Sequence, residues 1–345
     1  MKAAYISKHG GNEVLSVGEL PDPVPGAGEV LVGIRAAALN RLDVFVRNGI
    51  PGVPVSFPHV PGADGCGVVE AVGPGVAGLA AGDRVVLQPG LSCGACEFCR
   101  DGETSLCVDY GILGEHRAGT LAGKVVVPAR NAWKAPAHLT DEEAAAFPLA
   151  AMTAWRMLVT RAALRPGESV LIHGIGGGVS VYALQIARLA GAGLVVATSG
   201  SGAKLEAALK MGADAALDYR SVDVGKKVRE LTDKRGVDVV VDSVGAATWR
   251  ASLTAAAKKG RIVTCGATSG PNPEEEIRVI FWKQLSILGS TMGTDGEFRA
   301  LLDAVGRGLV KPVVDAVFPL AEVAKAYERI ESGAGFGKVV VRVAE

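Results

Sequence analysis

A glycine-rich segment near the middle of the chain constrains the fold more than any other feature. The apolar run Ser169–His173 leads through Gly174-Ile-Gly-Gly-Gly178 into Val179–Ala190, whose apolar residues recur at the helical period. Glycines between a buried strand and a helix let the backbone approach a pyrophosphate, and the helix N-terminus supplies N–H groups and partial positive charge. A tight strand–helix turn without a ligand is the alternative interpretation. We predict a dinucleotide-binding turn whose contacts come from Gly174, Gly176, Gly177, Gly178 and Val179.

The segments around this turn divide the chain into two kinds of structure. Before about residue 120, short alternating runs separated by Pro and Gly turns indicate a small barrel-like sheet. From about residue 140, apolar strands alternate with helices, which predicts a parallel sheet covered on both faces. The expected strands after the turn are 194–197, 237–241, 261–265 and 286–288. The terminal strand Lys338–Val343 suits a return to the first domain.

Composition limits the classes of partner. The 345 residues suggest two domains, or one discontinuous domain wrapped around another, and Lys plus Arg equal Asp plus Glu at 36 each. A neutral chain without basic stripes argues against nucleic acid and anionic lipid as partners. No apolar stretch approaches the ~20 residues of a membrane helix, and the first residues do not resemble a secretion signal. We therefore expect a cytoplasmic protein that acts on a small-molecule substrate.

Four of the six cysteines fall within fifteen residues in a Cys-x2-Cys-x2-Cys-x7-Cys array, formed by Cys93, Cys96, Cys99 and Cys107. In a reducing compartment such clustering indicates metal ligation rather than disulfides. Four thiolates suit tetrahedral zinc and leave no open position for water or substrate. The array therefore predicts a structural zinc site, in preference to four unrelated thiols.

The tip of the second expected strand bears on the choice of cofactor. NAD enzymes usually place Asp or Glu there, about twenty residues after the glycine turn, to bind the ribose hydroxyls. The stretch Ala197–Lys204 has no acid, but it offers Ser199 and Lys204 to a 2′-phosphate, which a carboxylate would repel. NADP is therefore favoured, and NAD stays possible because solvated loop residues would also explain the serines.

These signals, in this order, resemble the medium-chain dehydrogenase/reductase superfamily, in its zinc-type alcohol dehydrogenase and quinone oxidoreductase branches. Further landmarks cover the chain: Pro61-Gly-Ala-Asp64, Gly82-Asp-Arg-Val85, Thr153-Ala-Trp155, Asp242-Ser-Val-Gly245 and Gly337-Lys338-Val-Val-Val. The resemblance implies an α/β fold in which a Rossmann-type parallel sheet domain (131–290) is inserted into a β-rich GroES-like catalytic domain. That catalytic domain comprises 1–130, with the zinc lobe at about 90–110, and 291–345. The resemblance also adds Thr153, Tyr219 and Lys338 to the candidate cofactor contacts, and implies an active site between the domains.

The chain departs from the zinc-dependent pattern at each expected catalytic ligand. Asn40 stands where those enzymes carry the first metal-binding Cys, Ala63 where they carry His, and Leu149 near the third ligand. The segment Asn40-Arg-Leu-Asp43 instead resembles the zinc-free quinone oxidoreductase branch, where Asn lies near the nicotinamide. That branch usually lacks the four-cysteine lobe, so the chain is a hybrid of the two patterns.

Without a Lewis acid, quinones and α,β-unsaturated carbonyls are easier hydride acceptors than simple carbonyls, because the incoming charge is delocalised. We therefore predict an oxidoreductase that transfers hydride from NADPH to a quinone or enone without a catalytic metal. The candidate catalytic residues are Asn40, Asp43 and His116, with Phe45, Ile50 and the loop Glu115–Leu121 implied as pocket lining. Asn40 also has an interpretation as a satisfied turn amide, Asp43 as a partner of backbone or Arg41, and His116 as a solvated bystander.

Two other functions stay open from the sequence. One is an NAD(P)-dependent zinc alcohol dehydrogenase whose metal has unusual ligands such as Asp43, His59, Asp64 or Cys66. The other is a non-enzymatic cofactor-sensing or RNA-binding relative, against which the neutral charge argues. His59, Cys66 and Cys265 are otherwise expected to be structural. The apolar last strand at 286–288 predicts a homodimer or homotetramer through edge pairing.

Overall fold

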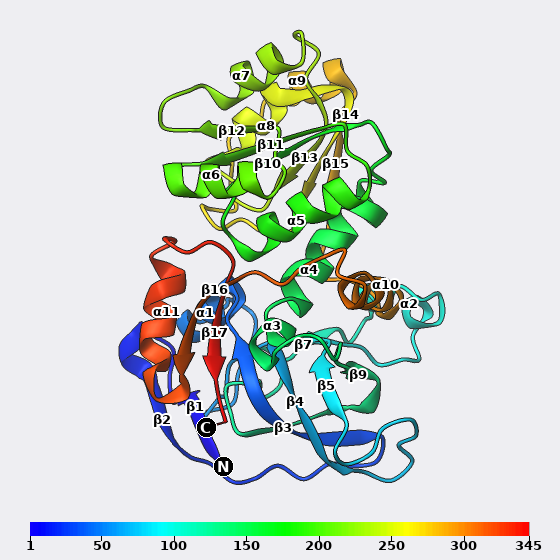
Figure 1. Cartoon of the computed structure of the whole chain (residues 1–345), viewed down its shortest axis with the longest axis vertical. Helices are drawn as coiled ribbons and strands as arrows, with labels where there is room; N and C mark the ends of the chain where they lie inside the picture. The colour runs from blue at the N-terminus through cyan, green and yellow to red at the C-terminus, as the bar shows by residue number, and fades with distance from the viewer. Residues whose placement is uncertain (345) are drawn as a thin grey trace. The chain divides into compact units, whose positions relative to one another are not determined.

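The computed structural model describes residues 1–344, which form two compact units (Figure 1). The first unit contains Met1–Leu149, Thr294–Arg307 and the chain from Pro312 onward, and the second contains Ala150–Gly293 and Gly308–Lys311. The first unit thus runs past the predicted boundary at residue 130, and the chain returns to it at Thr294. None of the helices within 1–344 is long and apolar enough to cross a membrane.

The first unit is built on a seven-stranded mixed sheet. Its order is β16-β17-β3-β4-β5-β9, with β8 also paired to β3, and only β16 and β17 run parallel. The strands are β3 (Glu29–Ala38), β4 (Asp64–Val72), β5 (Arg84–Leu87), β8 (Lys124–Pro128), β9 (Ala132–Lys134), β16 (Val314–Pro319) and β17 (Lys338–Arg342). Along β3, Val30, Val32 and Ile34 alternate into the core, as the period of a strand requires. The terminal strand predicted at 338–343 is confirmed as β17, which lies between the edge strand β16 and β3.

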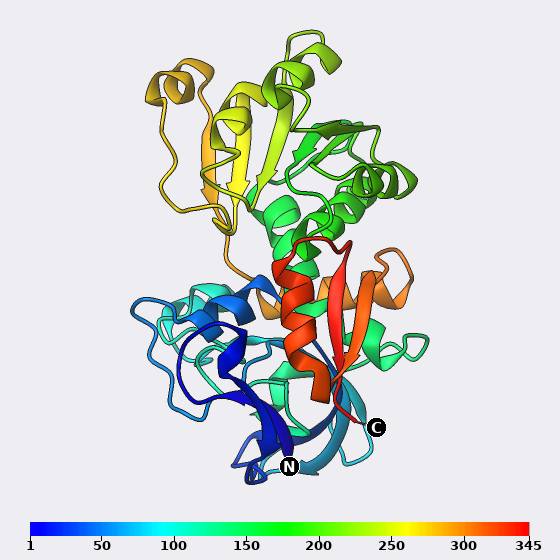
Figure 2. The ribbon, with the colours of Figure 1, turned by 90° about the vertical axis from the view of Figure 1, so that its left-hand side faces the viewer.

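Smaller elements close the first unit (Figure 2). The hairpin β1 (Lys2–Ile6) and β2 (Leu15–Glu19) and the pair β6 (Gly90–Leu91) and β7 (Gly111–Ile112) are antiparallel. The helices are α1 (Arg41–Asn48), α2 (Glu97–Arg100), α3 (Asp141–Ala145), α10 (Asp295–Gly306) and α11 (Val323–Glu331). The buried Arg47 of α1 bonds Glu331 of α11 at 2.7 Å, and this charged pair ties the two helices together.

The second unit is a six-stranded, fully parallel sheet of order β12-β11-β10-β13-β14-β15. Its strands are β10 (Ser169–Ile172), β11 (Leu194–Ser199), β12 (Ala215–Asp218), β13 (Val237–Asp242), β14 (Ala256–Thr264) and β15 (Ser286–Gly289). The order reverses between β10 and β13, which is where ligands bind in open α/β sheets. The predicted Rossmann-type sheet is confirmed.

Helices of the second unit include α4 (Pro148–Trp155), which begins in the first unit, and five crossover helices. These are α5 (Gly178–Leu189), α6 (Gly202–Lys210), α7 (Val224–Leu231), α8 (Trp249–Ala255) and α9 (Ile277–Lys283). One core cluster joins Leu171, Val196 and Val240 of the sheet to α7 and α8. Right-handed crossovers place α5 and α6 on the other face, so the Val/Ile/Leu strands are covered on both sides.

Candidate functional site

The glycine turn follows β10 and opens α5, as predicted. Gly174 and Gly176 have φ of 64° and 115°, in the region that favours glycine. A Cβ on Gly176 would lie 2.7 Å from Cδ of Lys204, so the missing side chain lets Lys204 lie against the turn. α5 begins at Gly178 with Gly177 as its N-cap. The first-turn N–H groups of a helix have no partner within it, so the geometry of this turn is compatible with the predicted binding of a phosphate.

Two neighbouring residues hold the turn in shape. Thr198 of β11 accepts from the backbone N–H of Ile175 (2.7 Å) through its carbonyl and from that of Gly174 (3.2 Å) through its hydroxyl. Ser180, which replaces the third fingerprint glycine, is buried and donates to the carbonyls of Gly174 and Gly177, both at 2.9 Å. The serine therefore acts as a clamp on the turn, a role that the sequence did not suggest.

The side chains that we predict to contact the adenosine end of the cofactor lie near the tip of β11. The hydroxyl of the buried Ser199 accepts from the N–H of Ser201 (3.2 Å). Tyr219 is 56% exposed and lies over Gly200, since a Cβ there would come within 2.7 Å of its hydroxyl. Thr153 is buried elsewhere in the same unit, where its hydroxyl contacts the sulfur of Met292. The structure thus brings Ser199, Lys204 and Tyr219 to one region beside the glycine turn.

An acid that sequence reasoning missed also lies at this tip. Asp218 ends β12 and is the register partner of Ser199. Its carboxylate accepts from Nε (3.0 Å) and Nη2 (2.8 Å) of Arg220, and this guanidinium lowers the pKa of Asp218 to about 2. The stretch Ala197–Lys204, which follows β10 and the glycine turn in the chain, contains no acid. The acid on the adjacent strand is ionised and is matched by Arg220.

In the first unit, Asn40, Asp64 and Lys338 form a buried polar cluster. The Lys338 ammonium lies 2.8 Å from Oδ2 of Asp64 and also donates to Oδ1 of Asn40. The Asn40 amide donates to the same Oδ2 at 2.8 Å. Oδ1 of Asp64 accepts from the backbone N–H of Leu149, also at 2.8 Å. Both carboxylate oxygens of Asp64 are therefore engaged.

Asp43 adjoins this cluster on α1. Its two oxygens accept from the backbone N–H groups of Asn40 (2.6 Å) and Gly62 (3.0 Å). Burial raises the pKa of Asp43 to about 7, although both hydrogen bonds act to lower it. Asp43 thus bonds backbone, which was one of the two roles expected for it, and it fixes the N-terminus of α1 against the Pro61–Gly62 segment.

Neighbouring residues have structural contacts. Nε2 of His59 donates to the carbonyl of Gly114 (2.9 Å), and burial lowers the pKa of this imidazole. The Cys66 thiol contacts Asp141 at 3.6 Å, and burial raises its pKa to about 12. Within residues 1–344, the donor atoms of three or more His, Cys, Asp or Glu side chains converge at the cysteine array alone. These contacts fit the structural roles expected for His59 and Cys66.

His116 lies on the loop between β7 and β8. The backbone N–H of Ile112 donates to its Nδ1 at 3.1 Å, so the neutral imidazole carries its proton on Nε2. The loop packs on the Pro61–Gly62 backbone: the N–H groups of Thr120 and Leu121 bond the Gly62 and Pro61 carbonyls at 2.9 and 3.1 Å. The Thr120 hydroxyl donates to the Asp64 carbonyl at 2.7 Å. This loop therefore backs directly onto the strand that carries Asp64.

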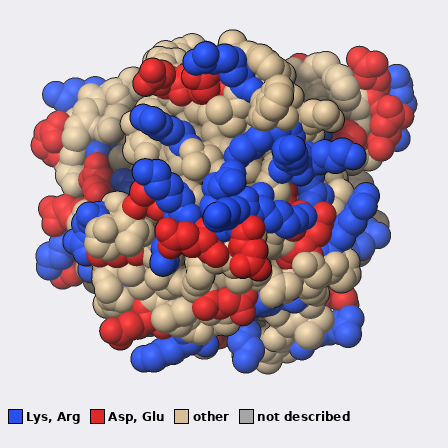
Figure 3. Space-filling model, turned by 90° about the horizontal axis from the view of Figure 1, so that it is seen from above, with Lys and Arg blue, Asp and Glu red and all other residues tan. Residues whose placement is uncertain are grey.

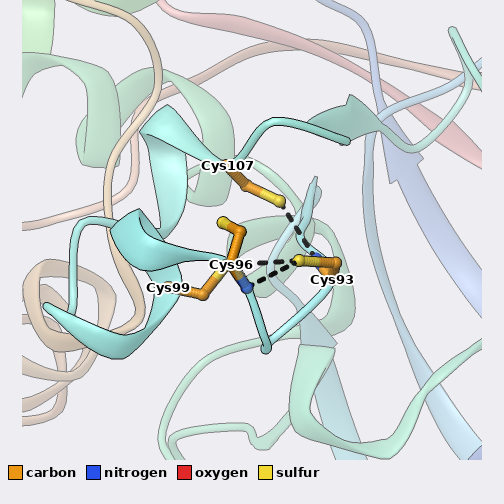
Figure 4. Close-up of side chains that lie close together, drawn as sticks. All are labelled: Cys93, Cys96, Cys99 and Cys107. Atoms are coloured by element: carbon orange, nitrogen blue, oxygen red, sulfur yellow. Dashed lines mark hydrogen bonds between the residues drawn. The ribbon is translucent and has the colours of Figure 1, made fainter.

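The four cysteines of the array converge as predicted (Figure 4). All four sulfurs lie within 4.8 Å of one another, and those of Cys93 and Cys99 are 3.9 Å apart. Sulfurs at the corners of a zinc tetrahedron, each about 2.3 Å from the ion, would be about 3.8 Å apart. Backbone N–H groups of Cys99 and Val108 lower the pKa of Cys96 to about 6. The donor set, its spacing and its N–H···S bonds all suit zinc, with no protein position left open.

Two segments of the sequence match models of known protein families. Residues 26–137 match an alcohol dehydrogenase GroES-like domain, and residues 178–307 match a zinc-binding dehydrogenase domain. The chain therefore belongs to the medium-chain dehydrogenase/reductase superfamily, and it is a nicotinamide-dependent oxidoreductase. The confirmed expectations are the superfamily, the fold class and the general reaction.

Three similar proteins show which activities occur among the relatives of this chain. A crystal structure of an NAD-dependent alcohol dehydrogenase is 49% identical, with a TM-score of 0.96 and full coverage of both chains. A zinc-type alcohol dehydrogenase-like protein of Schizosaccharomyces pombe is 36% identical over 92% of this chain and 91% of its own. An acryloyl-coenzyme A reductase of Metallosphaera sedula is 33% identical over 99% of each chain. This chain thus has relatives among both alcohol dehydrogenases and reductases of conjugated acyl groups.

Proposed function

We propose that this chain transfers hydride from NADPH to a quinone or an α,β-unsaturated carbonyl without a catalytic metal. The observation that carries the proposal is the buried cluster of Asn40, Asp64 and Lys338. In this cluster the ammonium of Lys338 supplies the positive charge that Asp64 requires. A metal ion bound by Asp64 would have to displace the ammonium of Lys338, and the adjoining acid, Asp43, already accepts from two backbone N–H groups.

The chemistry of the acceptor follows from this arrangement. The bound cofactor supplies the hydride, and the protein orients the two reactants. A conjugated acceptor spreads the arriving negative charge, so hydrogen bonds are sufficient to stabilise it. The similarity to an acryloyl-coenzyme A reductase, whose name specifies a conjugated acyl substrate, supports an acceptor of this kind.

Asn40 is the proposed contact at the junction of cofactor and substrate. Its Oδ1 accepts from Lys338 and one amide N–H donates to Asp64, so the plane of the amide is fixed. The second N–H of this amide makes no hydrogen bond within the described residues. That N–H would donate to the carbonyl oxygen of the substrate or of the nicotinamide.

His116 is the proposed proton donor. Because Nδ1 accepts from the Ile112 backbone, the transferable proton lies on Nε2, and the side chain is 40% exposed. We expect His116→Phe to lower kcat for enone reduction, because the variant has no proton to donate at this position. The exposed His138 gives a matched control, and His138→Phe should leave kcat unchanged.

An NAD-dependent alcohol dehydrogenase is the second candidate, and the 49% identity to a protein of that name favours it. A turnover panel of quinones, enones, aldehydes and alcohols with NADPH and NADH, combined with metal analysis of the same sample, separates the candidates. The proposal predicts quinone or enone reduction by protein that contains one zinc per chain. Alcohol oxidation that requires a second metal equivalent would establish the alternative.

A further inference from the structure

The second unit contains a cationic pocket away from the glycine turn. It encloses about 450 Å³ and is lined by Arg229, Lys234, Arg235, Ala257, Lys258, Trp282 and Lys283. Figure 3 looks onto the face where α7 and α9 lie, and Lys and Arg side chains gather near its centre. The lining residues precede or begin β13, β14 and β15, whereas the glycine turn follows β10. In a parallel sheet all strands begin on one side and end on the opposite side. The pocket therefore lies at the opposite side of the sheet from the glycine turn.

The five cations of the pocket differ in how they are compensated. Arg235 is paired with Asp238. Lys283 donates to the carbonyls of Leu253, Thr254 and Ala256 at 2.7–2.9 Å, and so caps the C-terminal end of α8. Arg229, Lys234 and Lys258 make no ion pair within residues 1–344, and the lining contains no Asp or Glu. Three uncompensated positive charges therefore face one cavity.

The pKa of Lys283 shows the effect of burial and of positive charge in this pocket. Burial and, as the smaller cause, the positive charge of Arg229 together lower the pKa of Lys283 to about 8. A compact cluster of like charges is unfavourable unless an anion enters it. The cluster is also held in place, since the N–H of Lys234 bonds the Arg229 carbonyl at 2.6 Å and Thr232 bonds the chain on both sides of the turn.

Trp282 adds an aromatic surface to the pocket. It is 75% exposed, although an indole ring is among the largest apolar groups that folding can bury. Exposed aromatic rings beside cationic grooves are used to stack on the bases of nucleotides, because every base presents a π face. A cavity of this volume is also in the range of sites for small molecules.

We infer that this pocket binds a nucleoside polyphosphate, with its phosphates on Arg229, Lys234 and Lys258 and its base on Trp282. The ligand is a second nucleotide, distinct from the nicotinamide cofactor at the glycine turn. Its binding does not depend on which substrate the enzyme reduces.

Calorimetric titration with GTP and with inorganic tripolyphosphate, in protein saturated with NADPH, tests the inference. Both probes should bind the wild-type chain. The triple variant R229A/K234A/K258A should weaken both by at least about ten-fold, which corresponds to the loss of one or more charged contacts. The matched control K2A/K8A/K210A removes three exposed lysines outside the pocket and should bind both probes normally.

The aromatic half of the pocket is tested separately. Trp282→Ala should weaken GTP by several-fold and leave tripolyphosphate unchanged, because only GTP has a base. The inference would be overturned if neither GTP nor tripolyphosphate bound the wild-type chain, or if the two triple variants lost equal affinity for them. It would also be overturned if a single-stranded RNA displaced GTP at far lower concentration, since the site would then serve a macromolecule.

Discussion

The ammonium of Lys338 lies 2.8 Å from Oδ2 of Asp64, and the two side chains are 2% and 0% exposed. Moving an ion pair out of water costs several kcal/mol per charge, so such a pair is retained only where geometry and further hydrogen bonds compensate. Here Asn40 bonds both partners and Leu149 bonds the remaining carboxylate oxygen. Removing one partner would leave a buried charge without compensation.

We therefore expect Lys338→Met to lower the free energy of unfolding by about 3–5 kcal/mol. The double variant K338M/D64N should recover part of the loss, because the second change removes the stranded charge. Lys124 and Asp22 form a partly exposed pair at 2.6 Å, and Lys124→Met should cost only about 0–1 kcal/mol. Urea denaturation measures all three, and equal losses in K338M and K124M would contradict the expectation.

Metal content is the second prediction. Elemental analysis of purified protein should give about one zinc per chain, since the array supplies one closed set of four thiolates. Cys99→Ser should lose the zinc and lower the melting temperature, because metal binding by the array contributes directly to folding. Cys265→Ser, at a cysteine outside the array, should keep it. Two zinc equivalents in the wild type would contradict this and favour the alcohol dehydrogenase.

The raised pKa of Asp43 predicts a dependence of stability on pH. Between its ordinary value of 3.8 and its folded value of about 7, Asp43 binds more proton in the folded than in the unfolded state. This residue's contribution to stability therefore falls as pH rises through that interval. Asp43→Asn does not titrate and loses one backbone contact, so its deficit relative to the wild type should shrink from pH 5 to pH 8. A melting-temperature difference that is constant with pH would contradict the raised pKa.

The sequence predicted the parts of the fold and the site that depend on local pattern. The strand, glycine turn and helix around Gly176 follow one another directly in the sequence, and the four cysteines of the array fall within fifteen residues. Their residue types and spacing largely determine their geometry. The buried runs at β10, β11, β13 and β14, and the short apolar run at β15 on the edge of the sheet, were likewise recognisable as strands of a parallel sheet.

Contacts between distant residues were not predictable in this way. Lys338 and Asp64 are 274 positions apart, and the sequence assigned one to the cofactor and the other to a possible metal. Only the register of β17 beside β3 and of β3 beside β4 brings them together. Asp218 was missed because β12 is a short strand, Ala215–Asp218, without a strong apolar pattern. The assignment of Lys338 to the cofactor stays a prediction.

Association of two copies is the fourth prediction. β15 pairs with β14 on one side and forms the edge of its sheet, and Ile287 on this strand is 39% exposed. An apolar edge strand favours pairing with its twin. Light scattering at micromolar concentration should give a dimer or tetramer, and Ile287→Lys should shift it toward monomer. Val24→Lys, at a residue 84% exposed in a loop, is the control. A monomeric wild type would contradict the prediction.

Cofactor preference is the last prediction. Lys204 lies against Gly176, and Ser199 and Tyr219 lie at the tip of β11, and we expect these three side chains to receive a 2′-phosphate. A charge-assisted bond from lysine to phosphate is worth about 1.5–3 kcal/mol. Lys204→Ala should therefore weaken NADPH by about one to two decades and NADH much less. Ser199→Asp should reverse the preference, because its carboxylate would repel the phosphate and accept from the ribose hydroxyls of NADH.

The control for this prediction is Lys210→Ala, an exposed lysine at the far end of α6, which should bind both cofactors as the wild type does. Fluorescence titration of the reduced nicotinamide measures each dissociation constant. Equal affinity of the wild type for NADH and NADPH would contradict the preference. In that case Asp218, which is the register partner of Ser199 and pairs with Arg220, would be the acid expected to bind the ribose. Asp218→Asn would then weaken NADH if its carboxylate binds the ribose, and would leave NADH unchanged if Arg220 keeps it fully engaged.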